Sequence, residues 1–268
     1  MSMRIAILMH QNARKLPLSR YAITHLARFW INDGNKVFVV FGDRDLVPAD
    51  IAILHVDLSI VPDSYLELAT HYPVVLNGKV RDIRKSTISK NLLVRDAIYS
   101  GKVIVKSDLN FAGMPERVVL TTPSSPPTVD FKLPQDYRVY DSLAQVPERY
   151  FDDPRVVVEK FLPEMEDDWY CVRNYLFLGD QTTCYRAVSR NPVVSGNCWE
   201  RVEIVEPHPE LLEWRQQLNF DYGKFDYVVH NGRPVLLDTN KTVGAPPPFP
   251  GLEEIWRNRA KGIYAYTS

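Results

Sequence analysis

Residues 223–244 read GKFDYVVHNGRPVLLDTNKTVG, and the order of apolar and polar residues in this stretch decides the fold. Apolar runs at residues 225–229 and 235–238 flank a polar segment that contains the pair Asn231-Gly232. β-Branched and aromatic residues on both sides of an Asn-Gly pair are typical of a β-hairpin. The sequence therefore predicts two antiparallel strands joined by a short loop.

The length of that loop decides which face of the hairpin carries Asp226. Asp238 and Asn240 share a face, because side chains alternate along a strand. A two-residue turn at the Asn-Gly pair would place Asp226 opposite Leu237 and on the other face, whereas a three- or five-residue loop would keep it on the Asp238 face. We expect a loop with an odd number of residues, since Pro234 cannot donate a hydrogen bond to a ladder and is better placed outside it.

With such a loop, the oxygen atoms of Asp226, Asp238 and Asn240 converge on one face of the hairpin. Hard oxygen ligands of this kind suit Mg²⁺, which usually keeps several waters and bridges to substrate phosphates. A half-solvated hairpin whose acids point at water explains the same pattern, because exposed aspartates are common. Spacing alone leaves both explanations open.

The hairpin resembles the C-terminal signature of the ATP-grasp superfamily, which has the glutathione synthetase-like ATP-binding fold and includes uncharacterised ligase-type proteins. In that signature two acids and an asparagine hold one or two Mg²⁺ ions against ATP. The resemblance implies these metal-binding roles for Asp226, Asp238 and Asn240, with ATP and Mg²⁺ as cofactors.

The chain departs from the family pattern at three places in this hairpin. The second acid is usually a glutamate, and here it is Asp238. Residues 241–243 are Lys-Thr-Val, where the family usually has small residues and a proline. Lys224 stands where the family often has an arginine that contacts the transferred phosphate, and a lysine supplies the charge without the bidentate fork.

The composition is that of an ordinary soluble globular protein, with 45% hydrophobic and 24% charged residues. A net charge of -1 gives no general attraction to nucleic acids or acidic membranes, so neither is an expected partner. The cysteines Cys171, Cys184 and Cys198 lack metal-site spacing, and their odd number argues against a full disulfide framework. The sequence contains neither a signal peptide nor an apolar stretch of membrane-spanning length, so we expect a cytoplasmic protein.

Strands and helices alternate in the first part of the chain, which predicts a small, doubly wound, parallel α/β layer at residues 1–85. The absence of GxGxxG argues against a dinucleotide-binding Rossmann module. His10, His55 and Asp57 fall at the carboxyl ends of predicted strands, where open α/β sheets bind ligands. They are candidates for the acceptor-substrate site.

A basic cluster precedes a helix that we expect at residues 87–98, and a predicted strand ends at Lys106 before a loop with Gly113. The cluster consists of Arg81, Arg84, Lys85 and Lys90. A lysine at the end of a strand beside such a loop can reach a phosphate that loop amides also bind. ATP-grasp enzymes use two lysines in this way, and by position the resemblance implies Lys90 and Lys106.

Residues 155–162 form another predicted strand, followed by an acidic run. In ATP-grasp enzymes the corresponding segment binds the adenine edge through its backbone, and a later acid binds the ribose hydroxyls. The resemblance implies Glu159, Phe161 and Leu162 for adenine and Glu166 for the ribose. An edge strand with an exposed acidic turn is the simpler explanation.

Two further strands are expected at residues 169–177 and 182–189, and arginines accompany them. Cations that face a phosphate site would neutralise charge during phosphoryl transfer. Arg173 and Arg190 are therefore candidate catalytic residues together with Lys224, although a surface arginine is the favoured explanation for each position taken singly.

The resemblance as a whole implies an ATP-grasp clamp of two α+β subdomains, at residues 86–158 and 159–268, after the N-terminal layer. Such enzymes activate a small-molecule carboxylate as an acyl phosphate, which an amine, thiol or similar nucleophile attacks. A small-molecule kinase and a nucleotide-binding protein with little catalysis are the alternatives on the same fold. A homodimer is among the assemblies that the resemblance implies.

Overall fold

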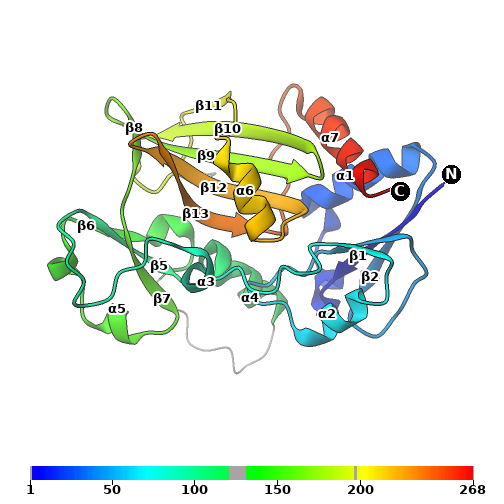
Figure 1. Ribbon diagram of the computed structural model, residues 1–268, viewed down its shortest axis with the longest axis horizontal. Coiled ribbons are helices and arrows are strands. Elements are labelled where there is room, and N and C mark those ends of the chain that lie inside the picture. Colours follow the sequence, from blue (N-terminus) through cyan, green and yellow to red (C-terminus); the bar gives the residue numbers. More distant parts are fainter. Residues whose placement is uncertain (1, 121–130, 196–197, 268) are drawn as a thin grey trace.

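The computed structural model describes residues 2–120, 131–195 and 198–267 of the chain. The described residues form three β-sheets with short helices around them (Figure 1). The N-terminal sheet and the smallest sheet lie along the lower side of the view in Figure 1, and the largest sheet lies above them.

The N-terminal sheet is parallel throughout, with the strand order β2-β1-β3-β4. Its strands are β1 (Arg4–Met9), β2 (Lys36–Phe41), β3 (Ile51–Leu54) and β4 (Val74–Leu76), and its helices are α1 (Ala22–Asn32) and α2 (Asp63–Ala69). Ile5 and Ile7 of β1 pack in one core with α1, whereas Ala6 and Leu8 pack in another with α2. Because alternate residues of β1 face opposite helices, the predicted doubly wound layer is confirmed.

The second sheet is antiparallel, with the order β6-β5-β7. Its strands are β5 (Val103–Ser107), β6 (Arg138–Tyr140) and β7 (Val156–Lys160), and the helices beside it are α3 (Lys85–Ile88), α4 (Met114–Val119) and α5 (Arg149–Asp152). Short 3₁₀ helices occur at Gln11–Lys15, Leu18–Arg20, Asn110–Gly113, Pro134–Asp136, Leu143–Gln145 and Lys261–Tyr266.

The helix expected at residues 87–98 is wrong, because α3 ends at Ile88. The backbone N–H of Leu93 donates to the carbonyl of Val158, and the N–H of Lys160 donates to the carbonyl of Asn91. The segment therefore satisfies its backbone groups against β7, and this tertiary pairing overrides a helical pattern in the sequence.

The third sheet has the order β11-β10-β9-β12-β13, and β8 pairs with β9 beside this path. Its strands are β8 (Glu164–Glu166), β9 (Trp169–Leu178), β10 (Gln181–Ser189), β11 (Arg201–Ile204), β12 (Tyr222–His230) and β13 (Arg233–Asn240). Helix α6 (Glu210–Gln217) lies against this sheet, and α7 (Leu252–Ala260) lies beside α1 (Figure 1).

The predicted hairpin is β12 and β13, but its loop is not the expected one. His230 pairs with Arg233, so the turn consists of Asn231 and Gly232 alone, and both residues have positive φ. An Asn-Gly pair favours this conformation. Pro234 lies inside the ladder, which is tolerated because β13 is an edge strand.

A β-bulge corrects the register that the two-residue turn would otherwise impose. Tyr227 pairs with Leu236 and Asp226 pairs with Asp238, so Leu237 is an extra residue in β13. A bulge places two residues of one strand opposite one residue of the other. Asp226 and Asp238 therefore lie directly opposite each other and share a face, as expected, although a bulge and not an odd loop brings this about.

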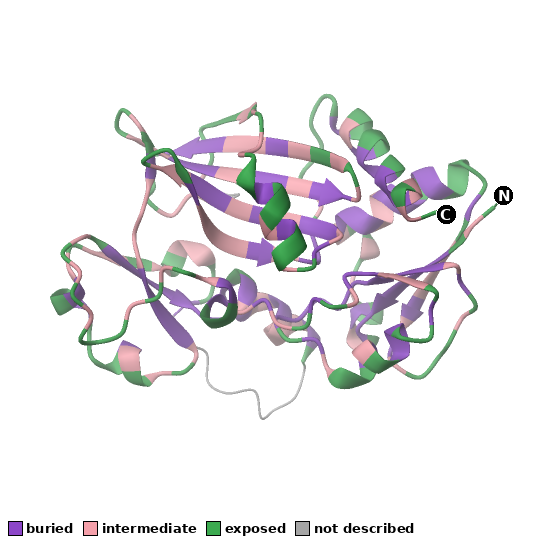
Figure 2. Ribbon diagram, in the orientation of Figure 1, coloured by how far each residue is buried: buried purple, intermediate pink, exposed green. Residues whose placement is uncertain are grey.

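The N-terminal layer shares its core with the C-terminal helix α7. Figure 2 shows buried residues on α1 and on α7, which lie side by side. The indole N–H of Trp30 in α1 donates to the carbonyl of Ala260 at the end of α7, over 2.8 Å. Strand β7 crosses the predicted subdomain boundary between residues 158 and 159. No helix in the described part of the chain combines the length and the apolar character needed to cross a membrane.

His55, which follows β3, should make the stability of the protein depend on pH. It is buried, and neither ring nitrogen has a hydrogen-bond partner among the described residues. Burial, together with the charge of Lys241, lowers the pKa of His55 to about 3. Because the unfolded chain binds this proton more readily, the free energy of unfolding should fall as the pH drops below the ordinary histidine pKa.

We expect His55 to account for a loss of about 2 kcal/mol of stability between pH 7 and pH 5. Urea unfolding of the wild type and of His55→Phe at the two pH values measures this loss. In the variant, the difference in the free energy of unfolding between the two pH values should be smaller by that amount. An equal pH difference in both proteins would contradict the prediction.

Candidate nucleotide site

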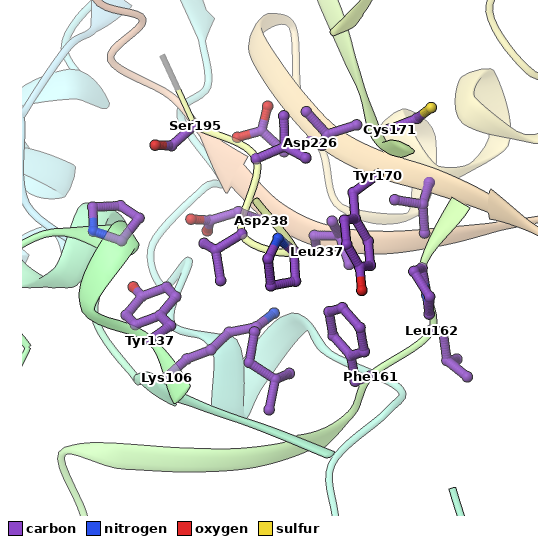
Figure 3. Close-up of a pocket in the computed structure, with 18 of the residues that line it drawn as sticks. Lys106, Tyr137, Phe161, Leu162, Tyr170, Cys171, Ser195, Asp226, Leu237 and Asp238 are labelled. Atoms are coloured by element: carbon purple, nitrogen blue, oxygen red, sulfur yellow. The ribbon is translucent and has the colours of Figure 1, made fainter. Parts of the chain in front are cut away.

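A cavity of about 200 Å³ lies between the three-stranded sheet and the sheet that carries the hairpin. Figure 3 shows Asp226 and Asp238 on one side of it, with Lys106 and Tyr137 across from them and Phe161 beside Tyr170. The predicted site residues that line the cavity are Lys106, Phe161, Leu162, Lys224, Asp226, Asp238 and Asn240. The structure thus brings together residues from β5, the segment after β7, and both strands of the hairpin.

The alternation of side chains along β5 explains how Lys106 reaches the cavity. Val103 and Val105 pack in the core on one face of the small sheet, whereas Ile104 and Lys106 line the cavity on the other. The Nζ of Lys106 lies 2.5 Å from a carboxylate oxygen of Glu159, which is buried on the neighbouring strand β7. Glu159 therefore neutralises Lys106 but does not itself line the cavity.

On the larger sheet, three polar side chains form a row across neighbouring strands. Asp226 on β12 pairs with Asp238 on one side and with Asn174 of β9 on the other, and all three line the cavity. Phe225 and Tyr227, on either side of Asp226, point instead into the core. A cross-strand row on one face of a sheet holds its side chains within reach of one another.

Each carboxylate of the hairpin is paired with a lysine. The Nζ of Lys224 lies 2.8 Å from Asp226, and the Nζ of Lys85 lies 3.4 Å from Asp238. Burial alone would lower the pKa of Lys85, but the nearby Asp238, Tyr137 and Glu159 outweigh it and raise the pKa above its ordinary value. Burial, with a contribution from Asp226, raises the pKa of Asp238. The site therefore holds Lys85 charged beside a carboxylate, Asp238, that is costly to ionise.

The donor set fits a divalent cation shared with a phosphate. The side-chain N–H of Asn240 donates to Asp226 over 3.3 Å, which leaves the Asn240 amide oxygen available as a ligand. Among the described residues, no group of three or more His, Cys, Asp and Glu side chains could hold a metal ion. A Mg²⁺ ion would thus take two carboxylates and an amide from the protein, and its other ligands from water and phosphate, which is the usual arrangement.

The segment after β7 supplies an apolar slot with an available backbone edge. The ring centroids of Phe161 and Tyr170 are 6.1 Å apart. The N–H of Phe161 donates to the carbonyl of Lys102, but the backbone N–H and C=O of Leu162 have no hydrogen-bond partner among the described residues. One donor and one acceptor beside apolar side chains can bind the edge of a purine, as expected for this segment.

Besides Glu159, four of the predicted site residues do not line the cavity. Lys90 is exposed on the segment that runs along β7, and Arg190 lies with its guanidinium 4.2 Å from the ring centroid of Trp169. Side chains alternate along β9, so Arg173 points to the opposite face from Asn174 and away from the cavity. There it pairs with Glu164. Glu166 pairs with Arg186 and Arg201. These four residues are not part of the site that we propose.

The structure adds two residues that sequence reasoning missed as site residues. Lys85 belongs to the basic cluster recognised in the sequence, but by position the family resemblance implied Lys90 instead. Lys85 is 1% exposed, and its Nζ also donates to the carbonyl of Leu109 over 2.9 Å. Asn174 lies on a correctly predicted strand, but only the pairing of β9 with β12 shows that it faces Asp226.

The loop after β5 contains a strained turn beside the cavity. Phe111 and Ala112 have φ of 46° and 55°, and Gly113 continues the left-handed turn with φ of 72°. A left-handed conformation costs a non-glycine residue ~1–2 kcal/mol, and such strain is typical of functional loops. Phe111 also lines the cavity, so the turn positions a ring at the site.

Stability variants at Phe111 test this strain. Phe111→Gly should be more stable than Phe111→Ala by about 1 kcal/mol, because glycine adopts the left-handed conformation without a steric cost. Both variants lose the same ring, so the comparison isolates the backbone. Urea unfolding measures the difference in stability between the two variants. A Phe111→Ala variant more stable than Phe111→Gly would contradict a strained left-handed backbone at this residue.

No protein-family model and no curated protein sequence matches the chain. Solved structures do match over nearly their whole length. A RimK domain ATP-grasp protein from Sphaerobacter thermophilus DSM 20745 is 12% identical, with a TM-score of 0.52, and the match covers 97% of this chain and 99% of that one. The macrocyclase MdnC from Microcystis aeruginosa MRC, solved with the precursor peptide MdnA, is 13% identical, with a TM-score of 0.51 and coverage of 96% and 98%.

The macrocyclase MdnB from Microcystis aeruginosa MRC is 11% identical, with a TM-score of 0.50 and coverage of 99% and 100%. Identities this low show the architecture and leave the activity open. The matches cover the N-terminal layer and both antiparallel sheets, because each extends over at least 96% of this chain. The chain therefore has the fold of the ATP-grasp superfamily.

Proposed function

We propose that the protein is an ATP-dependent ligase that activates a carboxylate as an acyl phosphate. The observation that carries this proposal is the convergence of Lys85, Lys106 and Lys224 with the Asp226–Asp238 pair in one cavity. Cations and carboxylates alternate there, which suits a triphosphate and its metal better than it suits a neutral ligand. The Leu162 backbone edge, at the other end of the cavity, supplies a place for the base.

In the proposed reaction an oxygen of the acceptor carboxylate attacks the γ-phosphorus, and ADP leaves with the electron pair of the broken P–O bond. The nucleophile then attacks the acyl carbon, loses its proton, and releases inorganic phosphate. Lys85, Lys106 and Lys224 would stabilise the charge on the transferring group. When bound, Mg²⁺ would supply further charge neutralisation between the phosphates.

The protein groups must rearrange when the nucleotide binds. Lys85 and Lys224 are engaged with Asp238 and Asp226, so the phosphates have to draw the lysines away as the cation takes their place. The cavity of about 200 Å³ is smaller than the ~300–1,000 Å³ of typical ligand sites. We therefore infer that the two sheets move apart to admit ATP.

The acceptor carboxylate and the nucleophile are proposed as small molecules, and peptides belong in the same screen because a structural neighbour was solved with a precursor peptide. We propose a cytoplasmic location, which the three free cysteines support, and no role for nucleic acid or membrane. A homodimer is the proposed assembly.

Calorimetric titration of ATP with and without Mg²⁺ is the first test. Mg²⁺-dependent binding supports the nucleotide site, and ADP release that requires both a carboxylate and an amine or thiol supports the ligase. A stable phosphorylated product would instead indicate a kinase, and binding without turnover a nucleotide-binding protein. No binding of ATP to the wild type would overturn the proposal.

A further inference from the structure

The segment that directly follows the cation-binding hairpin is buried, although it is rich in polar groups. Lys241 is 0% exposed and Thr242 is 9% exposed. A buried ammonium or hydroxyl group needs a hydrogen-bond partner to offset its lost hydration. The partners of these two side chains lie far away in the sequence, on the N-terminal layer.

Asp57, just after β3, is the centre of these contacts. Its carboxylate accepts a hydrogen bond from the Thr242 hydroxyl over 2.6 Å and another from the Tyr21 hydroxyl over 3.0 Å. The next residue, Leu58, accepts a hydrogen bond from the Nζ of Lys241 through its carbonyl. Asp57 itself is only 8% exposed, so the contact is shielded from water.

Backbone hydrogen bonds continue the same attachment. The N–H of Ala22 donates to the carbonyl of Val243 over 2.9 Å, and the N–H of Ala245 donates to the carbonyl of Arg20 over 2.8 Å. Tyr21 also forms an isolated antiparallel bridge with Gly244. The end of β13 is therefore held by the N-terminal layer, whereas the turn at the hairpin's other end is exposed.

We propose that Asp57 is a positioning residue that, through Thr242, fixes the Asn240 end of the cation site. This inference rests on the proposed function. Asn240 is only two residues from Thr242 along the chain, so a displacement of Thr242 moves the Asn240 amide relative to Asp226. Mg²⁺ demands near-ideal octahedral geometry, so a small displacement of Asn240 weakens the binding of Mg²⁺ more than it weakens nucleotide contacts elsewhere.

The contact also links two functions of the chain. The carboxyl edge of the N-terminal sheet carries Asp57, and the hairpin carries the cation ligands, so the layer predicted to shape the acceptor pocket also sets the cation geometry. Loss of groups that orient metal ligands typically lowers metal affinity ~10–100-fold. We expect a loss of metal affinity at the lower end of this range when the contact is broken, since backbone hydrogen bonds still hold residues 241–245.

The experiment compares Thr242→Val with Tyr21→Phe, because each variant removes one hydroxyl group and one hydrogen bond to Asp57. The affinity for ATP is measured calorimetrically with excess Mg²⁺ and with EDTA, and thermal unfolding is followed in parallel. Thr242→Val should lower the ratio of the two affinities about 10-fold and leave the affinity in EDTA unchanged. Tyr21→Phe should lose comparable thermal stability but keep a ratio of affinities near that of the wild type. Thr242→Ser, which keeps the hydroxyl group, should have the affinity ratio of the wild type.

The outcomes separate this inference from the proposed function. A wild type whose ATP affinity ignores Mg²⁺ overturns the proposed function, and this inference falls with it. A Mg²⁺-dependent wild type with an unchanged ratio in Thr242→Val overturns the positioning role alone, and so does an equal loss of both affinities. If Thr242→Val does not fold, Asp57→Asn is judged by the same ratio.

Discussion

Replacement of Asp238 with asparagine should lower ADP formation at least ~100-fold. The variant keeps an oxygen at the same place but loses the negative charge that Asp226 and Asp238 together offer to a cation. It also leaves Lys85 without its carboxylate partner. Mg²⁺-dependent ATP binding, measured by calorimetry, should be lost as well, because a single charged carboxylate and two amides are poor ligands for this ion.

Asp168→Asn is the matched control for this prediction. Asp168 belongs to the exposed acidic run after β8 and does not line the cavity, so its neutralisation should leave ADP formation and Mg²⁺-dependent binding unchanged. Equal losses in both variants would point to a general effect of charge. Full activity in Asp238→Asn would contradict the proposed cation site.

Lys85→Met should lower turnover by about 100-fold, because it removes a buried cation from the phosphate end of the cavity while keeping a side chain of similar length. The same change removes the lysine that is paired with the buried Asp238, so the variant should also unfold at lower urea. The double variant Lys85→Met/Asp238→Asn removes both partners. It should regain part of the stability and none of the activity.

Lys90→Met distinguishes the two lysines that sequence and structure assign to the same role. Lys90 is exposed and outside the cavity, so its replacement should change neither turnover nor stability by more than ~0.5 kcal/mol. Steady-state ADP formation and urea unfolding measure both quantities. A large loss in Lys90→Met with an active Lys85→Met would reverse our assignment.

Local patterns were enough to recognise most strands of this fold, but not the segment at residues 87–98, where the expected helix is wrong. The strands around Ile5 and Ile7 and around Phe225 and Tyr227 were predictable because side-chain alternation is set by neighbours along the chain. The hairpin turn was also readable in principle, since Asn231-Gly232 is a strong two-residue turn signal. Pro234 favoured a loop with an odd number of residues, and this prediction was wrong because an edge strand tolerates proline in its ladder.

The sequence by itself thus determined the parallel N-terminal layer, the hairpin, and the two acids and the amide that the hairpin carries. Only the tertiary structure decided that a bulge at Leu237 brings Asp238 opposite Asp226, and that Lys85 and not Lys90 enters the cavity. It also decided that the residues after Asn240 are held by Asp57. The reason is physical: alternation is a local property, whereas register, burial and ion pairing depend on segments distant along the chain that meet only in the folded protein.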